Sequence, residues 1–254
     1  VSIINAAPTI VSVQNSGPVF EGSPVQLTVT ATDPGADTLT YSFDLDNDGA
    51  FDVVDQPSGA RQHTFTDEGR YFVGVRVRDE DNGRAIGNTT VEVRNADPFG
   101  TLTVPEAVDE GQRFELVVQA SDPGRDVLKY DWDLDGDGLY DLEDTNLTTV
   151  ANVIQNEGTY TVACRVRDGD GGVAVITGQV LVRNVEPIAQ VSVLGAVEEG
   201  REALVQCRAR DAGGDALVFA FDFEDDGVVD IEGLPGAPDP ITGQPIVEIP
   251  HTWP

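Results

Sequence analysis

Apolar and polar residues alternate along most of the chain, in short runs that end at glycine, proline or aspartate. A clear run places its apolar side chains at Val25, Leu27, Val29 and Ala31. A period of two residues is typical of strands that bury one face. Because no segment carries a convincing helical stripe, the pattern predicts an all-β protein built from half-buried strands.

The alternating runs belong to an internal repeat. Phe114, Leu116, Val118 and Ala120 repeat the first run 89 residues later. Three Glu-Gly pairs keep the same interval, at Glu21, Glu110 and Glu199. About seven short strands in ~90 residues is the arithmetic of an immunoglobulin-like sandwich, so we expect tandem Ig-like β-sandwich domains in an elongated array.

The repeat sets the expected domain boundaries. We assign residues 1–5 to the end strand of an upstream repeat, 6–96 to domain 1, 97–185 to domain 2 and 186–254 to an incomplete domain 3. These boundaries predict a slice of a longer array. Domain 3 would then be completed either by further residues or by a strand from another chain, since an open sandwich exposes a sheet edge.

Charge narrows the classes of partner. The chain has 45 Asp and Glu against 15 Lys and Arg, a formal charge of −30. Such a surface repels nucleic acid and anionic membranes. No apolar run approaches the roughly 18 residues that span a bilayer, so we expect no membrane insertion. Cys164 and Cys207 fall on strands of different domains, which predicts that they are not bonded to each other.

Each repeat carries one acidic loop with carboxylates at alternate positions and a glycine at the sixth. Oxygen ligands at positions 1, 3, 5, 7, 9 and 12 wrap a calcium ion in this way. The candidate ligands are Asp44, Asp46, Asp48, Asp52 and Asp55 in the first loop, Asp133, Asp135, Asp137, Asp141 and Asp144 in the second, and Asp222, Glu224, Asp226 and Asp230 in the third. The third is the least complete, because Gly233 stands at position 12. The alternative is an acidic, solvated hairpin turn.

A second candidate cation site depends on the fold. In an Ig sandwich two loops and the incoming linker share one pole. For domain 2 this gathers Asp122, Asp126, Asp168 and Asp170 with Asn95 or Asp97; for domain 1, Asp33, Asp37, Asp79 and Asp81; for domain 3, Asp211 and Asp215 with Asn184 and Glu186. These residues either hold a cation that staples neighbouring domains or cap their own turns, as Asp-Pro-Gly does.

Three segments carry a family resemblance: Tyr130-Asp131-Trp132-Asp133, Glu157-Gly158-Thr159-Tyr160-Thr161-Val162, and Arg167 to Gly172. They resemble the PKD (polycystic kidney disease) type of Ig-like domain, over two whole repeats and half of a third. The junctions resemble cadherins on weaker motifs. The PKD resemblance implies a secreted or cell-surface protein in which the domains serve as spacers or adhesion units. The aspartate-rich loop departs from the usual turn of that family.

The same features bear on function. The carboxylates recur in repeated turns rather than in one unique pocket, and His63 and His251 stand at equivalent strand starts, so we expect no enzyme. We expect an extracellular structural or adhesion segment whose calcium-rigidified repeats form a stalk, adhesin arm or surface fibre. The alternative is an accessory binding or spacer module of a secreted hydrolase. Expected partners are neighbouring repeats of the same or an identical chain, and surface protein or polysaccharide.

Overall fold

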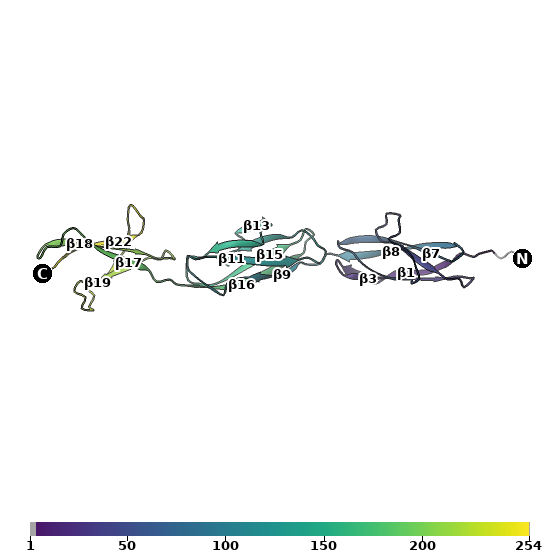
Figure 1. The fold of residues 1–254 in the computed structure, drawn as a ribbon, viewed down its shortest axis with the longest axis horizontal. Helices are drawn as coiled ribbons and strands as arrows, with labels where there is room; N and C mark the ends of the chain where they lie inside the picture. The colour runs from purple at the N-terminus through teal and green to yellow at the C-terminus, as the bar shows by residue number, and fades with distance from the viewer. Residues whose placement is uncertain (1–3, 254) are drawn as a thin grey trace.

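A computed structural model describes residues 4–253, and these residues form strands and no helix. Three sandwich-like units follow one another along an elongated molecule (Figure 1). The predicted all-β class and the tandem arrangement are confirmed. The proposed end strand falls mainly on residues 1–3, which lie outside the described range, and Ile4 and Asn5 belong to no strand.

Domain 1 is a sandwich of a three-stranded and a five-stranded sheet. Its strands are β1 (Thr9–Asn15), β2 (Val19–Phe20), β3 (Pro24–Thr32), β4 (Thr40–Asp44), β5 (Val53–Gln56), β6 (Ala60–Thr64), β7 (Gly69–Arg78) and β8 (Arg84–Arg94). The sheet orders are β1-β3-β6 and β2-β8-β7-β4-β5. The short strand β2 pairs in parallel with β8, whereas the other neighbours are antiparallel.

Domain 2 repeats this topology strand for strand. It contains β9 (Phe99–Thr103), β10 (Ala107–Asp109), β11 (Arg113–Ser121), β12 (Lys129–Asp133), β13 (Leu142–Thr145), β14 (Thr149–Val153), β15 (Gly158–Arg167) and β16 (Val173–Arg183). Its sheets run β14-β11-β9 and β10-β16-β15-β12-β13, and β10 pairs in parallel with β16. Because domains 1 and 2 have the same topology, the repeated sequence motifs recur at the same interval of 89 residues.

The alternating apolar residues form the cores of both sandwiches, as predicted. Val25 and Leu27 on β3 are fully buried, and Leu116 occupies the corresponding place on β11. The largest fully buried side chain of each core is aromatic, namely Phe43 on β4 and Trp132 on β12, each with no exposed surface. Burying alternate side chains of facing strands is what stabilises a sandwich of this kind.

Domain 3 has a smaller core. Its strands are β17 (Ile188–Leu194), β18 (Glu202–Arg210), β19 (Val218–Phe221), β20 (Ile231–Pro235), β21 (Ala237–Pro238) and β22 (Pro245–Thr252), in sheets β17-β18-β22-β21 and β19-β20. Cys207 belongs to this core and Cys164 to the core of domain 2. Both thiols are free within the described part of the chain, and the prediction that they face different cores is confirmed.

Candidate functional site

Two tight turns meet where domain 1 contacts domain 2. One is the Glu-Gly turn that follows β2, and the other is the Asp-Pro-Gly turn that follows β11. Gly22 has a φ of +68° and lies against the carbonyl oxygen of Pro123, where a side chain would collide with the backbone. A Cβ atom on Gly124 would lie 2.5 Å from the carboxyl carbon of Glu21. Glycine at both positions therefore permits the close approach of the two domains.

Glu21 stands at the centre of this junction. Its side chain has no exposed surface, although glutamate is rarely buried. Its Oε1 accepts a hydrogen bond of 2.9 Å from the backbone amide of Ala96 in the interdomain linker. Its Oε2 is buried and has no hydrogen-bond partner among the described residues. One oxygen thus ties the linker to domain 1, and the other faces domain 2.

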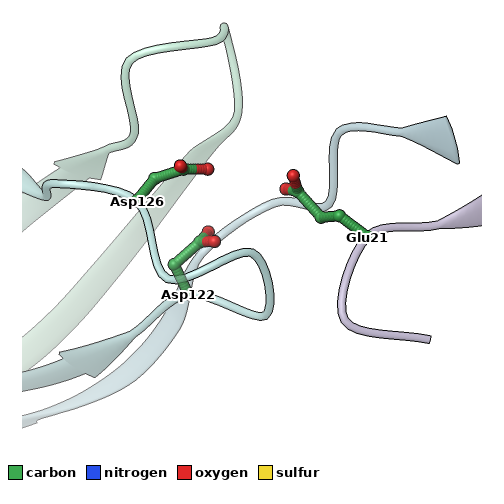
Figure 2. A group of neighbouring side chains, drawn as sticks. All are labelled: Glu21, Asp122 and Asp126. Carbon is green, nitrogen blue, oxygen red and sulfur yellow. The ribbon is translucent and has the colours of Figure 1, made fainter. Parts of the chain in front are cut away.

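Two carboxylates of domain 2 face Glu21 (Figure 2). Carboxylate oxygens of Glu21, Asp122 and Asp126 all lie within 4.8 Å of one another. Asp122 accepts a hydrogen bond of 2.7 Å from the amide of Gly124 through Oδ1. Its Oδ2 and the Oδ2 of Asp126 are buried and receive no hydrogen bond from residues 4–253. Three carboxylate oxygens without a donor therefore share one space between the domains.

Further carboxylates surround this group. Carboxylate oxygens of Glu21, Asp67 and Glu68 also lie within 4.8 Å of one another. The same holds for carboxylate oxygens of Asp67, Asp126 and Asp170. Domain 1 contributes three of these six residues and domain 2 the other three. Burial raises the pKa of Glu21, and the negative charges of neighbouring aspartates raise it further. Burial, followed by Asp122 and Asp170, likewise raises the pKa of Asp126.

Asp168 has a different role at the same pole. Burial would raise its pKa, but a side-chain hydrogen bond from Asn95 and backbone hydrogen bonds from its own turn outweigh burial, and the pKa is lowered. The Asn95 Nδ2 donates to Asp168 Oδ2 over 3.1 Å, and the amide of Gly172 donates to Oδ1 over 2.8 Å. Asp97 accepts from the amide of Val173 over 3.3 Å. Asp168 therefore caps its own turn, the second of the two roles weighed for the pole, whereas Asp97 connects the linker to the first residue of β16.

The junction between domains 2 and 3 repeats the glutamate geometry. Glu110 is 2% exposed, and its Oε1 accepts a hydrogen bond of 2.8 Å from the linker amide of Val185. Its Oε2 is buried without a partner in the portion of the chain that the structure covers. A Cβ atom on Gly213 would lie 2.6 Å from that oxygen. Asp211 accepts from the amides of Gly213 and Asp215.

The remaining pole belongs to the N-terminal end of domain 1. Carboxylate oxygens of Asp33, Asp37 and Asp79 gather there within 4.8 Å of one another. The Asn5 Nδ2 donates to Asp79 over 3.0 Å, as Asn95 does to Asp168. Burial and the neighbouring Asp33 raise the pKa of Asp37. Asp81 adjoins the group and contributes a negative charge that acts on Asp37. This pole and the pole between domains 1 and 2 therefore share the asparagine–aspartate hydrogen bond and a group of converging carboxylates.

The first acidic loop lies at the other end of β4 from the Asp33 turn. Carboxylate oxygens of Asp44, Asp46 and Asp48 lie within 4.8 Å of one another. Asp44 is 7% exposed; its Oδ2 accepts from the amide of Gly49, and its Oδ1 is buried with no partner in the described chain. Asp52 accepts from the amide of Leu45 over 2.7 Å. The loop is thus closed on itself and offers one buried free oxygen.

The other two loops close through the same hydrogen bonds. Asp133, which is 6% exposed, accepts from the amides of Gly136 and Gly138. In the second loop Asp135 accepts from Asp137, Asp137 from Leu139 and Asp141 from Leu134. In the third loop Asp222 accepts from Gly227, Asp226 from Val228 and Asp230 from Phe223, and Glu224 is exposed. Metal binding by these loops stays a prediction.

The residues at position 12 of the first two loops contact arginines. Asp55 Oδ1 lies 3.3 Å from Arg76 Nη2 and 3.1 Å from the Ser42 hydroxyl, which donates to it. Asp144 lies 3.4 Å from Arg167. Asp55 and Asp144, which the loop pattern predicts as ligands, thus lie beside arginines on the outer face of the five-stranded sheets, and metal binding by them stays a prediction.

A buried charge cluster lies beneath Asp144. Asp131 on β12 has no exposed side-chain surface. Its Oδ2 accepts from Arg165 Nε and Arg167 Nε, each over 2.8 Å, and its Oδ1 accepts from the amide of Asp144 over 2.7 Å. Burial alone would raise the pKa of Asp131, but these donors hold it well below its usual value. In domain 1 the residue that corresponds to Asp131 is Ser42, whose hydroxyl accepts hydrogen bonds from the amide of Asp55 and from Arg76.

The junction geometry leads to a first prediction. Alanine at Gly124 places a methyl group against the Glu21 carboxylate, which is held by Ala96, so we expect it to separate domains 1 and 2. The strain of such overpacking is about 1–3 kcal/mol. Small-angle scattering in calcium-containing buffer should show a broader range of interdomain distances. Gly169→Ala is the matched control, because a Cβ at Gly169 meets open space. An unchanged profile for Gly124→Ala would contradict the fixed junction.

Comparison with family models identifies the repeated domain. A family model described as PKD domain matches residues 5–94 and 95–182, more than half of the chain. Among solved structures, the fibronectin(III)-like modules of Clostridium thermocellum CbhA align at 17% identity over 69% of this chain and 94% of theirs, with a TM-score of 0.31. The four N-terminal Ig domains of Dscam1 isoform 6.9 align at 16% identity over 72% of this chain and 47% of theirs, with a TM-score of 0.40.

Proposed function

Because the chain belongs to the PKD domain family, we propose that it is a non-enzymatic segment of an extracellular stalk, adhesin arm or surface fibre, in which tandem domains act as a spacer stiffened by calcium. PKD domains are generally non-catalytic modules and typically occur in extracellular proteins. Residues 4–253 contain no helix that could span a membrane.

One observation carries the spacer proposal: the same contacts form at both junctions. Glu21 and Glu110 each bind a linker amide through Oε1 and face a glycine of the next domain with the rest of the carboxylate. A linker tied down in this way has little freedom to bend. Repeating the contact at a constant interval sets successive domains in a fixed relation, which is what a spacer requires.

The acidic loops support the proposal that the chain binds calcium. With a formal charge of −30, the chain repels itself unless cations neutralise it. Asp44, Asp46 and Asp48 converge, and Asp44 holds one buried oxygen free. Carboxylate and carbonyl oxygens are the ligands that calcium prefers. At ten times its dissociation constant, each bound ion would add roughly 1.4 kcal/mol to the stability of its domain by mass action.

Chelation tests this proposal. We expect small-angle scattering of the whole chain to report an extended particle in calcium, and EDTA to lower the melting temperatures of domains 1 and 2. Asp46→Asn with Asp135→Asn should reproduce the loss of stability without EDTA, because both residues lie in the loops and outside the junctions. Arg113→Gln, which changes an exposed charge elsewhere, serves as the control.

The contrary outcomes are distinct. A chain that bends freely in calcium would contradict the spacer. Melting temperatures that do not change when EDTA is added would contradict calcium binding by the loops. Retention on insoluble polysaccharide in a pull-down would instead favour an accessory module of a secreted hydrolase.

A further inference from the structure

We propose that the junction between domains 1 and 2 is a calcium site of its own, in which Glu21 Oε2, Asp122 Oδ2 and Asp126 Oδ2 bind one ion. The site is separate from the acidic loops. It rests on the proposed function in one respect, namely that the domains keep a fixed relation. It assigns the ion a role that the loops cannot have, because its ligands come from both sides of a junction.

The first argument is the burial of unsatisfied carboxylate. Glu21 has no exposed surface, yet its Oε2 has no donor in residues 4–253. Burying a charge without a partner is strongly unfavourable, and buried carboxylates are normally paired with a base or bound to a metal. The ion pairs formed within the described residues include none with Glu21, Asp122 or Asp126. A cation is the partner that is missing from this arrangement.

The second argument is the direction of the free oxygens. The amide of Ala96 holds Glu21 Oε1, and the amide of Gly124 holds Asp122 Oδ1. Each side chain is thereby fixed with one oxygen satisfied and one presented to the space between the domains (Figure 2). Gly124 approaches the Glu21 carboxylate so closely that a Cβ atom at this position would lie 2.5 Å from the carboxyl carbon. The ligands are oriented before the ion arrives, which lowers the entropy lost on binding.

The third argument concerns the kind of ion. The converging groups are all carboxylates, which favours a hard cation over zinc or copper. Calcium takes six to eight oxygens at flexible angles, whereas magnesium demands near-ideal octahedral geometry. Three monodentate oxygens leave positions for water and for the surrounding carboxylates of Asp67, Glu68 and Asp170. An irregular, carboxylate-rich site of this kind suits calcium.

Binding at this site has a consequence for the junction. Because Glu21 belongs to domain 1 and the two aspartates belong to domain 2, the full set of ligands exists only when the domains are docked. Calcium therefore stabilises the docked arrangement, and docking raises the affinity for calcium by the same factor. The site would convert calcium concentration into stiffness at one defined position along the chain.

Calorimetric titration of the whole chain with calcium tests the site. The background carries Asp48→Asn, Asp137→Asn and Asp226→Asn, which weaken the three acidic loops. In this background Glu21→Gln should weaken one class of site at least tenfold, since glutamine keeps the size and the Ala96 hydrogen bond but not the charge. Asp126→Asn, on the opposite domain, should have the same effect and covers the case in which Glu21→Gln fails to fold. Glu115→Gln removes an exposed charge on β11 and should change nothing.

A second measurement reports the relative placement of domains 1 and 2. Scattering at a calcium concentration that fills the junction site of Glu115→Gln but not the weakened site of Glu21→Gln should show a broader distribution of interdomain distances for Glu21→Gln. Unchanged stoichiometry and affinity in both Glu21→Gln and Asp126→Asn would overturn the site, even if the loops bind calcium. A chain that loses one calcium in these variants but is flexible throughout would keep the site and contradict the spacer, so the two proposals fail separately.

Discussion

Replacement of Asp131 by alanine is expected to lower the free energy of unfolding of domain 2 by about 3 kcal/mol, the lower end of the range for breaking a buried ion pair. The change leaves Arg165 and Arg167 without their shared partner and the amide of Asp144 without its acceptor. The loss stays at the lower end because the two arginine side chains are about one third exposed and turn to water.

Denaturant unfolding of the whole chain, followed by the fluorescence of Trp132, measures this loss. A Trp253→Phe background leaves Trp132 as the one tryptophan of the sequence. Domain 1 supplies the matched variant, because Ser42 there accepts hydrogen bonds from Arg76 and from the amide of Asp55. Asp131→Ser should therefore be milder than Asp131→Ala. A loss below about 1 kcal/mol for alanine would show that the cluster adds little to stability.

Truncation of Trp132 to alanine should lower the stability of domain 2 by about 3–5 kcal/mol, the range for removing a large buried aromatic side chain. Trp132 is fully buried between the two sheets, and its Nε1 donates to the carbonyl oxygen of Leu147 over 3.1 Å. The substitution removes apolar contacts, opens a cavity and leaves that carbonyl oxygen without its donor. Much of the net stability of a single domain would be lost.

Scanning calorimetry distinguishes the domains in this experiment. Trp132→Ala should move the transition of domain 2 and leave that of domain 1 in place. Phe43→Ala, the equivalent change on β4, should do the reverse. Trp132→Phe restores the side chain that domain 1 uses and should recover more than half of the loss. A single transition that shifts equally in both alanine variants would contradict independent cores.

The strands and their repetition were predictable because both leave patterns in the sequence, namely a two-residue alternation and a constant interval of 89 residues. A period of two residues reports which face of a strand is buried, and Val25, Leu27 and their counterparts follow it. The acidic poles were predictable from the topology alone, since an Ig sandwich brings its connecting loops together. Asp122, Asp126 and Asp170 accordingly meet at the junction.

Glu21 was not identified as a junction residue from the sequence. It was visible only as a repeat landmark, and its partners stand about one hundred positions further along the chain. The available signal was a glutamate followed by glycine, which stands one or two positions after an apolar pair in every repeat. The pairing of Asp131 was also missed, although Arg165 and Arg167 alternate with buried residues and so share one face of the sheet. Neither pairing can be derived without the distances between elements.

The parallel pairing of β2 with β8, and of β10 with β16, has a consequence for how the chain responds to force. Val19 lies beside Val93, and the amide of Glu21 donates to the carbonyl oxygen of Arg94. The chain enters a domain through the strand before this pair and leaves through the last strand. Tension along the molecule would therefore slide two parallel strands past each other in shear. All their hydrogen bonds would resist together, whereas a peeled hairpin breaks its bonds one at a time.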